Sequence, residues 1–274
     1  MTNKIPQEIE EKNKIYQGDC LELMKQIEDK SIDLILCDLP YGTTACKWDC
    51  EIDLDKLWIE YKRIIKDKGV IVLTASQPFT SKLVMSNLEM FKYCWIWDKV
   101  LHSNPFLAKK QPLNNYEDVC VFYKNQPTYN PIMWIGRYSK RGDFTHRGSE
   151  TKGNAKLFSK KGEGNIKYPI RIIRIPNSNK RNIFHPTQKP VALFEYLIKT
   201  YTNEGDLVLD NCIGSGTTAI ACIKANRKFI GIEISEEYCE IANKRIKELL
   251  SKIGEEKQNG IKIYRKEKGV NYNE

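Results

Sequence analysis

The segment Asp38-Leu39-Pro40-Tyr41 directly follows an apolar run at 32–37 and combines residue types that could perform chemistry on a flat ligand. A carboxylate accepts hydrogen bonds, a proline fixes its own φ, and a tyrosine presents an aromatic face. Together they suit a planar base whose exocyclic amine must be held and reacted. A strand that simply ends in a Pro-Tyr turn accounts for the same residues, so these positions alone leave both interpretations open.

A glycine-rich segment at 210–218 follows the short apolar run at 207–209 and supplies a second candidate site. Its glycines allow a tight turn and a close approach of the backbone to a ligand. Glu233 ends the next apolar run nineteen residues after Gly214, where a carboxylate can accept both hydroxyls of an adenosine ribose. A turn that only packs a helix on a strand is the structural alternative. The candidate ligand-binding residues here are Asp210, Asn211, Cys212, Gly214, Ser215, Gly216, Thr217, Thr218, Glu233 and Ile234.

The elements around both segments alternate between buried strands and amphipathic helices. The predicted strands lie at 14–20 (a short strand with its turn), 32–37, 70–73, 92–99, 119–124, 207–209 and 229–234. The predicted helices lie at 21–27, 54–66, 78–88, 190–201, 217–224 and 236–251. This alternation predicts an α/β fold with a doubly wound, mostly parallel sheet. Ligands bind such sheets beyond the carboxyl ends of the strands, which is where both candidate sites lie.

The positive charge of the chain is concentrated in one loop-rich segment. The net charge of 274 residues is +9, and residues 131–184 alone hold thirteen basic and three acidic side chains, a surplus of ten. Surplus lysine can serve solubility only, but this concentration favours contact with a polyanion such as nucleic acid. The residues assigned to that contact are Arg137, Lys140, Arg141, Arg147, Lys160, Lys161, Arg171, Arg174, Lys180 and Arg181.

A nicotinamide-dependent oxidoreductase is a competing hypothesis, because Gly214-x-Gly216-x-x-Ala219 also fits the dinucleotide fingerprint. It leaves the segment at 38–41 and the basic segment without a role. Asp210, directly before the glycines, favours a ligand with a positively charged amino group. S-adenosylmethionine carries an α-ammonium, a sulfonium and a ribose, so it fits these residues better than a pyrophosphate does.

The composition indicates where the protein resides and whether it binds a metal. No apolar stretch approaches the ~20 residues that a membrane span needs, and the first residues lack the apolar core of a secretory signal. Nine scattered cysteines, an odd number, favour a reduced cytoplasmic protein. Cys46 and Cys50 have no histidine or second cysteine pair at zinc spacing, so we predict no metal site.

The two candidate sites resemble the signatures of the amino-group DNA methyltransferases. Residues 38–41 are similar to the catalytic Asp-Pro-Pro-Tyr motif, and residues 210–218 to the cofactor loop Asp-Pro-Phe-x-Gly-Ser-Gly-Thr-Thr. The intervening His-Pro-Thr-Gln-Lys-Pro at 185–190 is similar to a third signature. This order of motifs resembles the β class of the family, and the resemblance covers about residues 14–250.

The resemblance implies a circularly permuted, seven-stranded methyltransferase sheet of Rossmann-like type that binds S-adenosylmethionine. It divides the chain into a catalytic part at 1–124, a basic target-recognition insert at 125–184 and a cofactor-binding part at 185–274. By resemblance, the catalytic residues are Asp38, Leu39, Pro40 and Tyr41, and the cofactor site gains Asp19, Cys20, Asp38, His185, Thr187, Gln188 and Lys189. The sequence departs from the family at Leu39, which replaces a proline, and at Asn211 and Cys212, which replace Pro-Phe.

The activity that the resemblance implies is methyl transfer to the N6 amine of an adenine flipped out of double-stranded DNA. Asp38 and the main-chain carbonyl of Leu39 would each accept an amine hydrogen, and Tyr41 would stack on the base. Asp rather than Ser at position 38 favours adenine, with cytosine-N4 methylation as the alternative. RNA as the substrate, a homodimer and a cognate restriction endonuclease all stay open.

Overall fold

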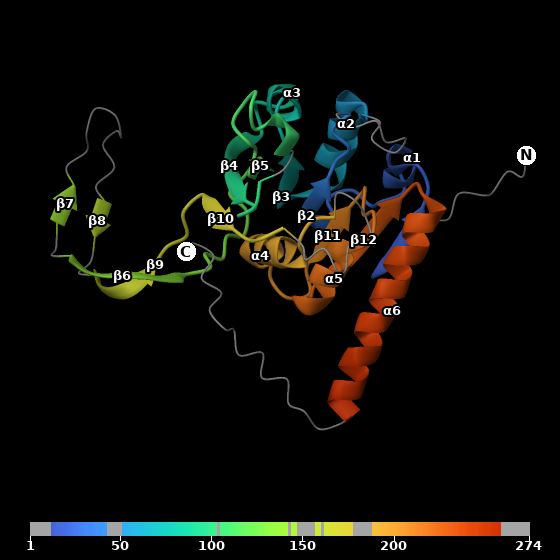
Figure 1. Ribbon diagram of the computed structural model, residues 1–274. Helices are drawn as coiled ribbons and strands as arrows, with labels where there is room; N and C mark the ends of the chain where they lie inside the picture. The colour runs from blue at the N-terminus through green and yellow to red at the C-terminus, as the bar shows by residue number, and fades with distance from the viewer. Residues whose placement is uncertain are drawn as a thin grey trace, which may run out of the picture.

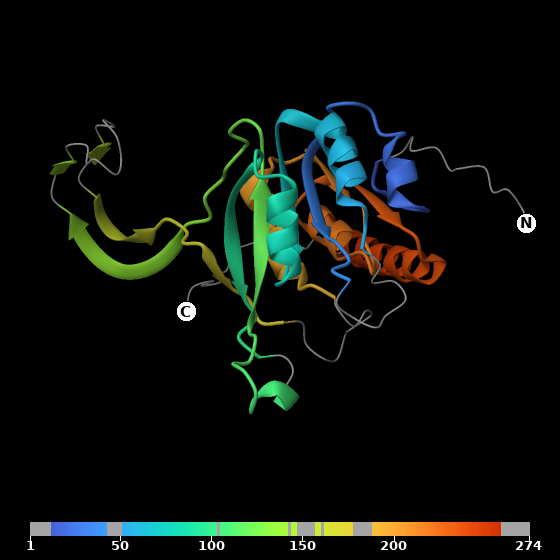
Figure 2. The ribbon, with the colours of Figure 1, turned by 90° about the horizontal axis from the view of Figure 1, so that it is seen from above.

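One large sheet with helices on both faces forms the body of the protein (Figures 1 and 2). The computed structural model describes residues 12–42, 51–102, 105–141, 144–146, 157–159, 162–177 and 188–258. Within these ranges, no helix has both the length and the apolar character that crossing a membrane requires.

The central sheet has eight strands. Their order is β1 (Lys14–Gln17), β12 (Lys228–Glu233), β11 (Leu207–Asp210), β2 (Ile32–Asp38), β3 (Ile65–Ala75), β5 (Tyr116–Phe122), β4 (Phe91–Asp98) and β10 (Ile172–Arg174). All pairs are parallel except the two that β5 makes with β3 and β4. The predicted α/β, mostly parallel, doubly wound fold is therefore confirmed.

The predicted count of seven strands was wrong. The additional strand is β10, whose Ile172 pairs with Ile96 at the outer edge of β4. It lies inside the segment that the sequence assigned to a basic insert, where three residues of strand between charged neighbours give no readable pattern. Part of that predicted insert thus completes the central sheet.

In the part of the chain that the structure describes, six helices cover the sheet at the places where the sequence predicts them. They are α1 (Cys20–Met24), α2 (Leu54–Ile64), α3 (Phe79–Ser86), α4 (Val191–Tyr201), α5 (Thr217–Lys224) and α6 (Glu236–Gln258). The last helix extends to residue 258 rather than 251.

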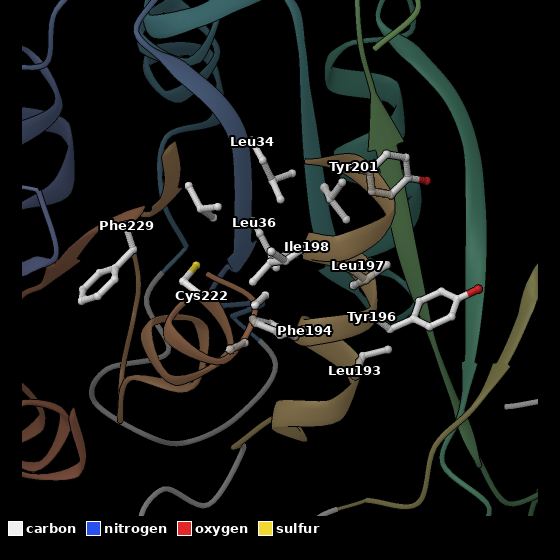
Figure 3. Packing of buried hydrophobic residues seen from close by; sticks show 14 of the residues in the cluster. Leu34, Leu36, Leu193, Phe194, Tyr196, Leu197, Ile198, Tyr201, Cys222 and Phe229 are labelled. Carbon is white, nitrogen blue, oxygen red and sulfur yellow. The ribbon is translucent and has the colours of Figure 1, made fainter. Parts of the chain in front are cut away.

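Alternate residues of β2 face two different cores because side chains of a strand point to opposite faces. Leu34 and Leu36 belong to a core with α4, α5 and α6, and Figure 3 shows both on the side of β2 that faces α4. Ile35 belongs to the other core, with α1, α2 and α3. Burial on both faces explains why β2 reads as a continuous apolar run.

The segment between β5 and β10 forms an arm that projects beyond the β10 edge of the sheet (Figures 1 and 2). The sequence predicts only loops here. In the structure β6 (Trp134–Arg141) pairs antiparallel with β9 (Gly162–Lys167), and β7 (Phe144–His146) with β8 (Leu157–Ser159).

Candidate active site

The candidate catalytic and cofactor residues meet at one edge of the sheet. Asp38, Asp210 and Glu233 are the last residues of β2, β11 and β12, which are parallel neighbours. The reversed strand β5 begins at this same edge, where Asp118 lies opposite Ala75. The site therefore combines residues from the carboxyl ends of parallel strands with residues from the start of an antiparallel one.

The carboxylate of Asp38 is held through both of its oxygens. Its Oδ1 accepts the hydroxyl of Tyr41 at 2.9 Å and also the hydroxyl of Thr74 on β3. Its Oδ2 lies 2.6 Å from the Nζ of Lys189. With only 23% of its side chain exposed, Asp38 has little freedom to turn away from this arrangement.

Lys189 and Glu117 form a buried ion pair behind Asp38. The Nζ of Lys189 lies 3.3 Å from Glu117 Oε2, and the Nζ of Lys99 lies 2.6 Å from Glu117 Oε1. Burial acts to raise the pKa of Glu117, but the two ammonium groups outweigh it and hold the pKa below its usual value. Burial acts to lower the pKa of Lys189, but Asp38 and Glu117 outweigh it and raise the pKa. Glu117 and Lys189 are therefore both charged at neutral pH.

Tyr41 is fixed by its ring and by its hydroxyl. The ring stacks on Phe79 with centroids 5.2 Å apart and an interplanar angle of 22°. Burial raises the pKa of the hydroxyl, and the charges of Asp38 and Glu117 raise it further, so the group stays protonated and can donate. The stacking of Tyr41 on a base stays a prediction.

The glycine-rich loop between β11 and α5 is anchored to Glu233. The main-chain N–H of Gly214 donates to Glu233 Oε2 at 2.8 Å, and that of Ser235 to Oε1 at 2.9 Å. Burial raises the pKa of Glu233, opposed by these main-chain donors. Gly216 has a φ of +83°, and a Cβ there would lie 2.9 Å from the Cβ of Ala242. Only glycine satisfies both the conformation and the packing at this position.

Asp210 stabilises the same loop from inside. It is 2% exposed, accepts the main-chain N–H of Cys212 at 3.1 Å and accepts the hydroxyl of Thr218. Burial raises the pKa of Asp210 to about 7, although both hydrogen bonds oppose the shift. Its predicted pairing with a ligand ammonium stays a prediction, because the contacts seen here are with the protein.

The two residues of this loop that depart from the family pattern, Asn211 and Cys212, have partners of their own. Asn211 Oδ1 accepts a buried hydrogen bond of 2.6 Å from the hydroxyl of Tyr61 on α2. The side-chain amide of Asn211 in turn donates to the Sγ of Cys212 at 3.6 Å. The loop is thus attached to α2 by a buried polar contact.

Other predicted cofactor residues adjoin this loop. Asp19 Oδ1 caps α1 by accepting the main-chain N–H of Leu21 at 2.8 Å. Gln188 Oε1 accepts the hydroxyl of Ser215 at 3.3 Å. Ile234, directly after Glu233, is 66% exposed.

The predicted nucleic-acid residues that the structure describes fall into two groups. Arg137 is exposed on β6 of the arm. Arg171 lies over the ring of Tyr93 at 5.3 Å, and Arg174 pairs with Asp98 at 3.0 Å, so both also contact the body of the protein.

Several predicted site residues cannot be placed. His185, Thr187, Arg147, Lys160, Lys161, Lys180 and Arg181 lie outside the described residues, as do the side chains of Lys140 and Arg141.

Thr74, Lys99 and Glu117 contribute to the site but were not predicted from the sequence. The periodicity of the segment at 119–124 indicates a strand but not its direction, so its first residues were not expected at this edge. The available signal was the acidic pair Glu117 and Asp118 directly before a buried apolar run.

Comparisons with known proteins give the family of the chain. Residues 32–244 match the family model N6_N4_Mtase, described as DNA methylase. The chain is 31% identical over 250 residues to the DNA adenine methyltransferase YhdJ of Escherichia coli (strain K12), covering 85% of this chain and 82% of YhdJ. It is 28% identical over 245 residues to the type II methyltransferase M.HpaI of Haemophilus parainfluenzae, covering 84% and 72%.

A solved structure also resembles the fold. The M1.HpyAVI–SAM complex aligns with a TM-score of 0.58 at 26% identity, over 85% of this chain and 98% of that one. These matches favour a methyltransferase over the nicotinamide-dependent oxidoreductase considered from the glycine spacing. The chain belongs to the DNA methylase family.

Proposed function

We propose that the protein transfers a methyl group from S-adenosylmethionine to the N6 amine of an adenine flipped out of duplex DNA. The observation that carries this proposal is the position of Asp38. Its carboxylate, fixed through both oxygens, ends the strand next to β11, which opens directly into the glycine-rich loop. An acceptor for an amine and a loop for a nucleoside therefore lie side by side.

The residues of the loop fit S-adenosylmethionine. A Cβ built on Gly214 would meet no described atom within 4 Å, so the space beside its backbone is open. Glu233 presents a buried carboxylate suited to ribose hydroxyls, although each oxygen already accepts one main-chain N–H. Asn211 begins the loop, where the hydroxyl of Tyr61 on α2 holds its side chain. When bound, the cofactor supplies an electrophilic methyl group on sulfur.

Asp38 has capacity left to accept the amine. A carboxylate oxygen has two lone-pair sites, and Oδ1 uses both for Tyr41 and Thr74. Among the described residues, Oδ2 accepts only from Lys189, which leaves one site on that oxygen. With the carbonyl of Leu39 accepting the second hydrogen, the nitrogen lone pair is directed away from the ring. This prealigned geometry supplies much of the rate.

Adenine is the target base that the residues favour. Asp at position 38 resembles the adenine-specific form of the motif, and the relative YhdJ is named a DNA adenine methyltransferase. Cytosine-N4 methylation is the second candidate, because the amine of cytosine presents the same two hydrogens to Asp38 and to the carbonyl of Leu39.

The arm is our candidate for reading the DNA, within an insert that we place at 125–184. A two-stranded β ribbon such as β6–β9 fits the major groove, and Arg137 is exposed on it. A second copy of the chain and a cognate restriction endonuclease are further partners that this function would accommodate.

The experiment that tests the function is direct. The protein is incubated with duplex DNA and methyl-labelled S-adenosylmethionine, and the DNA is digested to nucleosides for mass spectrometry. We expect label in N6-methyladenine. Label in N4-methylcytosine would establish the second candidate, and unlabelled DNA across duplexes of varied sequence would refute the proposal.

A further inference from the structure

Lys189 connects the cofactor loop with the catalytic carboxylate. Its main-chain carbonyl accepts the hydroxyl of Thr217, the first residue of α5, at 3.4 Å. Its side chain is 7% exposed and ends at Asp38 and Glu117, with the Nζ 5.5 Å from the centroid of the Tyr41 ring. The resemblance placed this lysine among the cofactor residues, but its ammonium group lies beside the catalytic carboxylate of Asp38.

Glu117 contacts the ammonium group of Lys189 through Oε2, an oxygen that also lies 3.3 Å from the hydroxyl of Tyr41. It reaches the site because β5 runs antiparallel, and its side chain is 11% exposed. Lys99 holds its other oxygen, and the Nζ of Lys99 also lies 5.4 Å from the centroid of the Trp97 ring. The four groups Lys99, Glu117, Lys189 and Asp38 alternate in sign, so each buried charge has an opposite neighbour. Such an arrangement is costly to break because an unpaired charge would remain in a poorly solvated place.

We propose that Lys189, held by Glu117, is a positioning residue that fixes the orientation of Asp38 for the target amine. Tyr41 and Thr74 restrain Oδ1, and Lys189 restrains Oδ2, so the plane of the carboxylate is set from both sides. Without Lys189, Oδ2 loses its partner among the described residues and the carboxylate can rotate about its Cβ–Cγ bond. This inference rests on the proposed methyl transfer.

The test separates a positioning role from a cofactor-binding role. In Lys189→Met we expect the single-turnover rate, at saturating cofactor and DNA, to fall about 100-fold, the effect of a misplaced reacting group. The dissociation constant for S-adenosylmethionine, measured by calorimetry, should not change. Glu117→Gln should also lower the single-turnover rate, but by a smaller factor. Lys199→Met, which removes a lysine paired with Glu195 at 3.1 Å on α4, is the matched control and should change neither quantity.

A weaker cofactor affinity with an unchanged rate at saturation would overturn the proposal and return Lys189 to the cofactor site. An unchanged rate and an unchanged affinity would also overturn it.

A second measurement does not depend on activity. The free energy of unfolding of the ligand-free protein is measured for Lys189→Met, Asp38→Asn and the double variant. We expect the two changes to be non-additive, because directly paired residues couple. Additive effects would refute the pairing, whereas a wild-type protein that methylates no DNA would refute the proposed function and leave this result intact.

Discussion

The hydroxyl of Tyr61 on α2 donates a hydrogen bond of 2.6 Å to Asn211 Oδ1 at the start of the glycine-rich loop. Both side chains are buried, and Asn211 stands where the family pattern has a proline. The loop is therefore held by a specific polar contact across the carboxyl edge of the sheet.

Tyr61→Phe should destabilise the protein. The change leaves a buried amide oxygen without its donor, which costs about 1–3 kcal/mol in the free energy of unfolding. Urea unfolding of the variant and the wild type measures this difference. Tyr168→Phe, at a tyrosine that is 71% exposed, is the control and should have no effect. Equal stability of Tyr61→Phe and the wild type would show that the contact contributes nothing.

Glu233→Gln should weaken the binding of S-adenosylmethionine. The amide replaces one acceptor oxygen with an NH₂ group that must face the main-chain N–H of either Gly214 or Ser235, and the charge is lost. We expect the dissociation constant to rise about tenfold, equivalent to about 1.4 kcal/mol, by calorimetry. Glu240→Gln, at an exposed position of α6, is the control. An unchanged constant for Glu233→Gln would assign this carboxylate to the loop alone.

Asp210 should give stability a specific pH dependence. Its pKa is raised by burial from 3.8 to about 7 in the folded protein. The folded state then binds more protons than the unfolded state between these values, so stability from the protonated group is full below about pH 4 and is lost as the pH rises to about 7. The loss is on the order of 4 kcal/mol.

The comparison that checks this is between the wild type and Asp210→Asn, which does not titrate. Unfolding free energies measured from pH 4 to pH 8 should show the wild type losing stability relative to the variant as the pH rises. Parallel curves over this range would mean that Asp210 is ionised throughout.

Arg137→Gln should weaken DNA binding through electrostatics. Each phosphate contact that is lost lowers the slope of log affinity against log salt by about 1. Fluorescence anisotropy over a salt series measures the slope, with Lys252→Gln on α6 as the control. If the slope for Arg137→Gln equals that of the wild type, this residue of the arm does not contact phosphate.

The sequence predicted those parts of the site that end buried parallel strands. Asp38, Asp210 and Glu233 were predicted because each stands at or directly after the end of an apolar run. Glu117 was not predicted because hydrophobic periodicity does not reveal the direction of a strand. β5 runs antiparallel to the neighbouring strand β3, which brings Glu117 to this edge.

Contacts between residues distant in the sequence explain the remaining differences between the prediction and the structure. Arg174 reads as a DNA contact in a basic segment, yet in the structure it ends β10 and pairs with Asp98 of the neighbouring strand. Lys189 reads as a cofactor residue from its signature, but only the fold shows that its side chain turns toward Asp38. The spacing of residues along the chain does not reveal toward which partner either side chain turns.

The central claim is that Asp38 accepts the target amine, and Asp38→Ala tests it most directly. Methyl transfer to duplex DNA is measured with labelled cofactor in a single turnover, and cofactor affinity is measured by calorimetry on the same preparation. We predict a rate at least about 100-fold lower, with the dissociation constant for S-adenosylmethionine unchanged. A rate close to that of the wild type would contradict the account.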